Sequence, residues 1–565
     1  GAVIDSSVIG GTTAAAGSFT TLTASSNLSV DGGTIKLDGN YPTGTGNVAL
    51  GDTALDSVTT ASNNTIVGNA AGTAITESNF NTVVGSLALD AQVTGGRNTA
   101  IGYSALGADT TGGRSVAVGH GALGDQNFTG GEITYNVAVG YQALTQNTTG
   151  TSNTAQGYHA LYANTTGIEN VAIGKSTMVA NTTGSYNTSM GVAALDANTT
   201  GGLNVAIGNG ALSGNTTASN NTAVGTNALL ANTTGPNNTA VGSSALAANT
   251  TGDTNTAVGY LSMDANTTGT NNVAVGDNTL GANTTAANNT AVGSQALAAN
   301  TTGTENVAVG ALAGDAITTG NHNTAIGYIS LSAATTANDN TAVGREALRD
   351  TTTGHSNTAV GKEAMKLNTT GHSNTTMGIN AGQSITTASN NLLLGKDAGV
   401  TGSPGGNITT SSNNIVLGDE NIGNLYCTQT SISTSDRRDK NSITNFTGGL
   451  SWINAMNPVT YKWDRRSWYI DSDATPEDLL AVTPDGTHVN PSLEIGLVAQ
   501  DVLDIEQANG YGSNNDNSLL VNLTEDETRY GINYTKIVPI LISAIKELST
   551  KLEAAEARIT TLEGE

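Results

Sequence analysis

The chain has 565 residues and a formal net charge of −25, yet only 12% of its residues are charged and 4% are aromatic. This composition argues against ordinary globular domains for most of the chain, because such domains carry about twice that share of charged residues. It also argues against nucleic acid as a partner, because phosphate binding requires clustered Lys and Arg. A single cysteine, Cys427, excludes an intrachain disulfide framework and a Cys-rich zinc site. We therefore expect no metal and no cofactor, and no apolar run is long enough for membrane insertion.

The first 46 residues precede a series of repeats. Their segment "IDSSVIGGTTAAAGSFTTLTASSNLSVDGG" is rich in Thr, Ser and Gly, which predicts a β-rich cap for the first repeat. This segment is similar to connector sequences that are common in bacteriophage tail-fibre proteins. The resemblance implies that residues 1–46 connect the chain to the phage tail or baseplate, or to another fibre protein.

A short repeat occupies residues 47–426, as in "NTAVGTNALLANTTGPN" followed by "NTAVGSSALAANTTGDT". Its motif glycine stands at positions 51, 68 and 85 and keeps this spacing of 17 up to Gly395, except for a step of 21 between Gly119 and Gly140. A last copy ends at Gly418, which makes 22 copies in all. A helical-hairpin repeat needs more than about 30 residues, so the repeat is a β structure.

Each copy combines a β-like run (T-A-V-G), a second short run (x-x-A-L) and a polar turn (A-N-T-T-G). Alternation in the first run places Val or Ile on one face and Ala on the other, and we expect stacked copies to bury the Val column. The glycine fits a tight corner or a close backbone approach. The Asn before the run is expected to form a ladder along the stack. The pattern predicts a mainly β chain with an elongated parallel β-roll or β-solenoid.

The N-V-A-I-G form at residues 204–208 resembles the head repeats of trimeric autotransporter adhesins. That resemblance implies left-handed parallel β-rolls that trimerise side by side. Repeats of that family usually have a shorter period than the one found here, so the resemblance covers the strand and the corner but not the turn. A monomeric β-solenoid and an intertwined triple β-helix remain alternatives, because the period does not separate them.

Composition changes abruptly after a junction at residues 427–434. Residues 435–565 contain all three Trp, 21 of the 45 acidic residues and 11 of the 20 basic ones, which predicts a small α+β domain. Apolar residues near the end are spaced alternately by four and three, which predicts a long coiled-coil helix at about 537–563 and an oligomer. An amphipathic helix packed on its own domain is the alternative. The seam consists of Val538, Leu541, Ile545, Leu548, Leu552, Ala555, Ile559 and Leu562.

Four segments in this region carry a family resemblance: "SDRRDKNSI" at 435–443, "GLSWINAMNPVTYKW" at 449–463, "EIGLVAQDV" at 494–502 and "YGINYTKIVPILISAIKEL" at 530–548. In order and spacing they resemble the endosialidase-type intramolecular chaperone domain at the C-terminus of phage tail spikes and fibres. The resemblance implies a trimerising chaperone that helps the rod to fold and then cuts itself off.

Members of that family share the pattern S-D-x-R-x-K, with cleavage just before the serine. The residues that match are Ser435, Asp436, Arg438 and Lys440. The resemblance implies that Ser435 is the nucleophile, Lys440 the base and Thr434–Ser435 the scissile bond, with Asp436 and Arg438 as orienting or structural partners. It implies one self-cleavage per chain and no turnover of an external substrate.

The chemistry sets conditions on this pair. A serine hydroxyl is a poor nucleophile until a base takes its proton, and a lysine is a base only when burial or nearby positive charge keeps it neutral. Arg437 and Arg438 supply positive charge, whereas Asp439 stands where the family often has an apolar residue and favours a protonated lysine. Residues five apart do not share a helical face, so a bend or a second subunit is required. The alternative is a solvated helix-capping turn.

We expect a homotrimeric phage tail-fibre or tail-spike shaft that is assembled in the host cytoplasm, becomes part of the virion and attaches to a glycan or protein receptor on the host. The alternatives are a bacterial surface adhesin, an ice-binding solenoid that presents its Thr-rich turns, and an enzyme that acts on host polysaccharide. His355 and His372 are one period of the repeat apart and should stack on adjacent coils as exposed turn residues.

Overall fold

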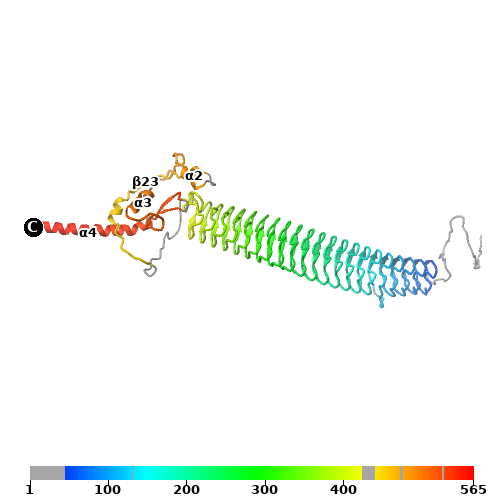
Figure 1. The fold of residues 1–565 in the computed structure, drawn as a ribbon. Coiled ribbons are helices and arrows are strands. Elements are labelled where there is room, and N and C mark those ends of the chain that lie inside the picture. The colour runs from blue at the N-terminus through cyan, green and yellow to red at the C-terminus, as the bar shows by residue number, and fades with distance from the viewer. Residues whose placement is uncertain (1–44, 132, 423–439, 471–474, 525–526, 565) are drawn as a thin grey trace, which may run out of the picture. The chain divides into compact units, whose positions relative to one another are not determined.

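A computed structural model describes residues 45–131, 133–422, 440–470, 475–524 and 527–564. Nearly all of the expected connector and the junction at 427–434 lie outside these residues. The fold is mainly β, as predicted: a parallel β-solenoid of about 20 turns, a small α+β region and a long terminal helix (Figure 1).

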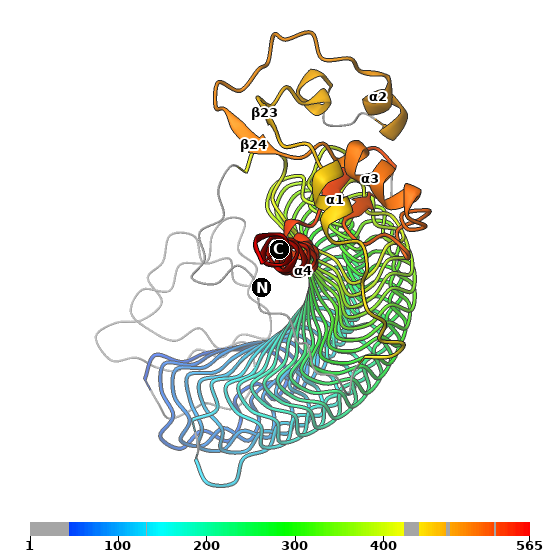
Figure 2. The same ribbon diagram turned by 90° about the vertical axis from the view of Figure 1, so that its left-hand side faces the viewer.

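The repeats form stacked coils, each with one three-residue strand that pairs in parallel with the strand one coil away (Figure 2). Register is exact from coil to coil, so that Thr239, Ala240 and Val241 lie beside Thr256, Ala257 and Val258. Coils of residues 45–169 contain β1 Val48–Leu50, β2 Thr65–Val67, β3 Thr82–Val84, β4 Thr99–Ile101, β5 Val116–Val118, β6 Val137–Val139 and β7 Thr154–Gln156.

The coils from residue 170 onward contain the remaining fifteen strands of this kind. Their bounds are β8 Val171–Ile173, β9 Thr188–Met190, β10 Val205–Ile207, β11 Thr222–Val224, β12 Thr239–Val241, β13 Thr256–Val258, β14 Val273–Val275, β15 Thr290–Val292, β16 Val307–Val309, β17 Thr324–Ile326, β18 Thr341–Val343, β19 Thr358–Val360, β20 Thr375–Met377, β21 Leu392–Leu394 and β22 Ile415–Leu417.

The core of each coil differs from the sequence-based expectation. The middle residue of the strand is buried and the third residue is not: Ala240 is fully buried, whereas Val241 is 36% exposed. The expectation that stacked coils bury the Val column was therefore wrong. Asn238 is buried as well, and with a period of two this inward Asn turns Ala240 inward and Val241 outward. The apolar filling comes from that Ala and from the buried Leu of the second run, such as Leu246.

Buried asparagines form the predicted ladder. The backbone N–H of Asn255 donates to Oδ1 of Asn238 at 3.0 Å, and its side-chain Nδ2 donates to the carbonyl of Gly269 at 2.8 Å. A second ladder runs through the turns, where Nδ2 of Asn249 donates to Oδ1 of Asn232 at 2.8 Å. Neighbouring coils thus satisfy most of each other's buried polar groups, although some buried atoms, such as Nδ2 of Asn221 and Oδ1 of Asn300, have no hydrogen-bond partner.

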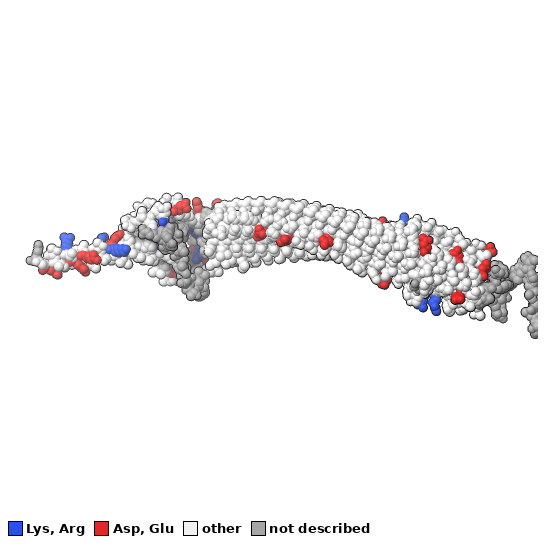
Figure 3. Space-filling view, turned by 90° about the horizontal axis from the view of Figure 1, so that it is seen from below, with Lys and Arg blue, Asp and Glu red and all other residues white. Residues whose placement is uncertain are grey.

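The motif glycine meets both conditions inferred for it. Gly242 has φ +139°, and a Cβ there would lie 2.2 Å from the carbonyl oxygen of Gly259. Only glycine permits such a close approach of neighbouring coils. Charged residues are sparse on the solenoid face that Figure 3 shows.

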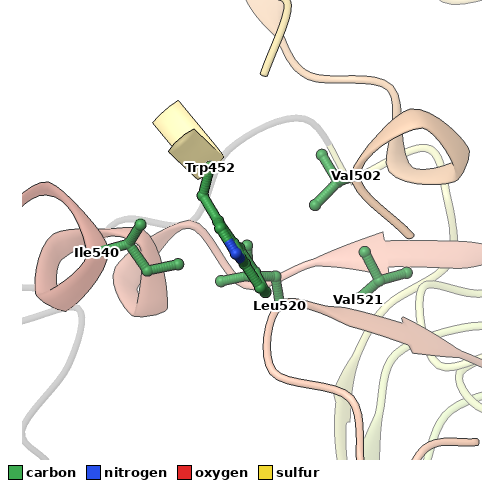
Figure 4. Packing of buried hydrophobic residues seen from close by; sticks show 5 residues of the cluster. All are labelled: Trp452, Val502, Leu520, Val521 and Ile540. Atoms are coloured by element: carbon green, nitrogen blue, oxygen red, sulfur yellow. The ribbon is translucent and has the colours of Figure 1, made fainter. Parts of the chain in front are cut away.

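The C-terminal region has two antiparallel strand pairs, β23 with β24 and β25 with β26. Its elements are α1 Leu450–Ala455, β23 Val459–Tyr461, η2 Arg466–Tyr469, α2 Pro476–Ala481, β24 Glu494–Gly496, α3 Ala499–Ala508, β25 Val521–Leu523, β26 Tyr530–Ile532, η3 Tyr534–Lys536 and α4 Ile537–Glu563. A small core joins α1, α3, β25 and α4 and consists of Trp452, Val502, Leu520, Val521 and Ile540 (Figure 4). The helix predicted from the four-three spacing is α4.

Candidate functional site

The predicted cleavage site lies almost entirely outside the described residues. Thr434, Ser435, Asp436 and Arg438 are not described, and Lys440 is the first described residue after them. Lys440 is exposed. The pairing of Ser435 with Lys440 therefore stays a prediction, and the burial that a neutral lysine requires is not provided by the described part of this single chain.

The segment that follows Lys440 leads into α1, which packs closely on α4. Trp452 of α1 is 2% exposed and meets Phe446 edge-on, with ring centroids 5.3 Å apart. The backbone N–H of Leu450 donates to Oε2 of Glu547 at 3.1 Å, and a Cβ on Gly449 would lie 2.7 Å from the backbone nitrogen of Ala544. Close packing of this kind fixes the chain downstream of Lys440 against the terminal helix.

Helix α4 packs on the domain only along its first part, and residues 548–563 are exposed on all sides. Ile540 and Ala544 are buried in the domain core. The seam residues are exposed instead: Val538 54%, Leu541 41%, Ile545 64%, Leu548 56%, Leu552 58%, Ile559 53% and Leu562 67%. The alternative that this seam packs on its own domain is not what the structure has. A row of exposed Leu and Ile along one helix face is typical of a surface that a partner helix covers.

A second unpartnered surface runs along the solenoid, and sequence reasoning missed it. The third residue of each solenoid strand faces outward. It is Val, Ile, Met or Leu in every such strand except β7, where it is Gln156, and we call this column the aliphatic strip. Examples are Val275 at 36%, Ile326 at 38% and Met377 at 51% exposure. The inward Asn one residue before each strand was the signal that could have placed these side chains outside.

Charged side chains gather at a few coils only. Glu346 is 7% exposed and accepts from Nζ of Lys366 at 2.8 Å and from Nη1 of Arg349 at 3.1 Å. The hydrogen bond from Lys366 lowers the pKa of Glu346 to about 2, against the opposing effect of burial and with further help from Arg345. This network holds two adjacent coils together by charge and has no cavity or nucleophile that points to catalysis.

The stacked histidines lie as predicted, with the rings of His355 and His372 parallel and their centroids 4.8 Å apart. Within the described residues, no group of three or more His, Cys, Asp or Glu side chains is placed to hold a metal ion. None of the helices in the described ranges is both long and apolar enough to cross a bilayer.

Comparison with known proteins identifies the C-terminal region. Residues 435–511 match the Peptidase_S74 family, described as chaperone of endosialidase. No curated protein matches the chain, and no solved structure does. The chain thus carries a chaperone-of-endosialidase domain after a long β-solenoid. This domain implies self-cleaving activity and a trimerising chaperone at the C-terminal end of the solenoid.

Proposed function

We propose that the protein is the precursor of a homotrimeric tail-fibre or tail-spike shaft of a bacteriophage, which attaches the virion to a glycan or protein on the host surface. Its C-terminal domain aligns three chains and then cuts itself off before Ser435. After assembly in the host cytoplasm the mature shaft would be part of the virion, joined at its N-terminal end to the tail, the baseplate or another fibre protein. The family match and two exposed apolar surfaces support this proposal.

The exposed seam of α4 is the observation that carries the proposal. Each fully buried Leu or Ile contributes roughly 1.5–3 kcal/mol relative to an exposed one, so a row of them in water is unfavourable. An a/d seam is complementary to another copy of itself, which makes further copies of this chain the expected partners. Three helices would enclose the seam as a small core.

The aliphatic strip supports lateral assembly of the same three chains along the solenoid. An outward column of Val and Ile on a parallel sheet is a surface that another coil can cover. Identical coils carry no information about which coil pairs with which, and a shift by a whole repeat preserves almost every contact. A C-terminal seed would set this alignment before the coils associate.

The proposed cleavage follows from the same assembly. Because Lys440 is exposed in one chain, we assign its burial to the neighbouring subunits, so that the lysine becomes an effective base only in the trimer. Lys440 would take the hydroxyl proton of Ser435, and Oγ would attack the carbonyl carbon of Thr434. The C–N bond then breaks as the amine gains a proton, and water hydrolyses the ester to leave a carboxylate on Thr434.

Intact-mass spectrometry with native electrophoresis tests this scheme on the wild type, Ser435→Ala and Lys440→Met. We expect the wild type to yield fragments that end at Thr434 and begin at Ser435, and a trimeric shaft. Both variants should form trimers that stay uncut. A folded wild-type trimer that remains intact would overturn the cleavage and make the domain a permanent clamp, whereas a monomeric wild type would overturn the trimer.

A further inference from the structure

One corner of each coil displays side chains whose chemistry changes along the solenoid. We call this position the display corner. It lies two residues before the first residue of the strand. In residues 45–169 this corner has φ between 51° and 72°, and its occupants are Gly46, Asn63, Phe80, Arg97, Arg114, Tyr135, Ser152 and Glu169. Asn tolerates this left-handed conformation, whereas bulky residues adopt it at a free-energy cost. Phe and Arg at this corner are exposed, so the packing of the coils does not require them.

Four successive display corners form an aromatic–arginine column. The guanidinium carbon of Arg97 lies 5.3 Å from the ring centre of Phe80, and that of Arg114 lies 5.7 Å from the ring centre of Tyr135. Nη1 of Arg114 also donates to the Tyr135 hydroxyl at 2.8 Å. All four side chains are exposed. The stacking holds each guanidinium over a ring and leaves its other N–H groups available.

The two arginines carry the basic charge of these coils. They are the only Lys or Arg residues between positions 45 and 169, and Figure 3 shows a small basic group near the N-terminal coils. Within the described residues no ion pair joins either of them to an acidic side chain. Arg97 and Arg114 stand on adjacent coils, each over a different ring, so an anion from outside the chain would add the charge partner that both lack.

The insertion between Gly119 and Gly140 supports one end of this column. The longer step between Gly119 and Gly140 inserts a loop that projects from the coils (Figure 2). Phe128 anchors the loop at 4% exposure, and its carbonyl accepts from Oγ1 of Thr111 at 2.6 Å. The backbone N–H of Thr134 donates to the carbonyl of Gly113 at 3.0 Å. The insertion thus seats Tyr135 firmly over Arg114.

We propose that the column of Phe80, Arg97, Arg114 and Tyr135 binds an acidic glycan, a polymer of sugar rings that carry carboxylates. The guanidinium pair would bind carboxylates, and the two aromatic side chains would contact the apolar faces of the rings. This inference rests on the proposed role in host attachment and names the ligand class. Two cations are too few for binding driven by counterion release from a nucleic acid.

The proposal is tested by measuring how tightly the purified full chain binds polygalacturonate. The fully methyl-esterified polymer is the control ligand, because it has the same sugar backbone without the negative charge. The double variant Arg97→Asn/Arg114→Asn removes both cations and inserts a residue that other display corners, such as Asn220 and Asn237, already hold at φ 62° and 59°. Its affinity for polygalacturonate should fall about tenfold or more. Lys175→Asn removes an exposed charge elsewhere and should change affinity less than about twofold.

Several results would overturn the inference. One is that the wild type fails to bind polygalacturonate, or binds the esterified polymer equally well. Another is that a single-stranded oligonucleotide of the same charge binds as tightly to the wild type and no longer binds to the double variant. That result would indicate a general anion site. A third is that the double variant lowers assembly in native mass spectrometry, which would make the column a contact between subunits. Normal assembly and cleavage without glycan binding would leave the proposed maturation intact and reject this site alone.

Discussion

In the solenoid, a buried side chain meets its own counterpart one repeat away, whereas in the C-terminal region it meets residues from distant parts of the chain. Ala240 lies beside Ala257 in the paired strands. Trp452, by contrast, shares a core with Val502 and Ile540. Contacts between equivalent residues allow further coils to be added in the same way, and they do not specify which coil of one chain pairs with which coil of another. Contacts between unlike residues define one arrangement, which is what an assembly seed needs.

The first prediction tests how strictly the coils depend on close approach. Gly242→Ala places a Cβ 2.2 Å from the carbonyl of Gly259 at φ +139°, so the coils on either side must separate. We expect a loss of more than about 4 kcal/mol in unfolding free energy, with local opening seen as new protease cleavage near residue 242.

Gly131→Ala is the matched control, because Gly131 also has positive φ, +76°, but no atom lies within 4 Å of the added Cβ. It should cost only about 1–2 kcal/mol, the strain of a left-handed backbone. Equal effects of the two substitutions would mean that backbone conformation, and not the contact between coils, makes the motif glycine necessary.

Sequence reasoning worked where a local rule decides and failed where two rules compete. Period, motif glycine and Asn ladder followed from spacing and residue chemistry. Alternation shows that a strand has two faces but not which of them is buried. The apolar side chain of Val suggested that the Val face is buried. In the structure Asn238 is buried instead, and Ala240 therefore points inward. Non-local features could not be foreseen, such as Glu506, which is fully buried and accepts from the backbone N–H of Leu519 at 3.0 Å. The cleavage residues came from a family pattern, which names side chains but does not place them in space.

The second prediction addresses the seam on which the C-terminal region depends for assembly. Leu548→Glu puts a carboxylate at a 56% exposed seam position of α4, where it must be desolvated if the helices associate. We expect assembly to weaken by about 100-fold or more, roughly 2.7 kcal/mol. Light scattering after size-exclusion chromatography measures the mass as the chain is diluted.

Thr550→Glu introduces the same residue two positions further on the same helix but outside the seam, and it should leave assembly unchanged. Because the seam is exposed in the single chain, neither substitution should lower the stability of the monomeric domain by more than about 0.5 kcal/mol. If Thr550→Glu dissociates the protein as strongly as Leu548→Glu, helix propensity or net charge would explain the effect, and the seam would lose its role.

The smallest expected effect concerns the cluster of charged side chains around Glu346. The pKa of Glu346 is lowered from 4.5 to about 2, chiefly by the hydrogen bond from Lys366. A lowered pKa in the folded state means that the carboxylate stabilises the fold fully above pH 4.5, and that this contribution is lost as the pH falls toward 2. The cluster lies at the surface of a thin coil, so solvent screening reduces the contribution to about 1–2 kcal/mol.

Glu346→Gln should therefore destabilise the solenoid by about 1–2 kcal/mol at neutral pH, and the difference from the wild type should vanish as the pH approaches 2. Glu305→Gln is the control, because Glu305 pairs with His322 at 3.5 Å but is 57% exposed and should contribute less than about 0.5 kcal/mol. Denaturant unfolding across this pH range measures both. If the difference in unfolding free energy between Glu346→Gln and the wild type is the same at all pH values, the effect of Glu346 would be due to packing. Its charge would then contribute nothing to the stability of the solenoid.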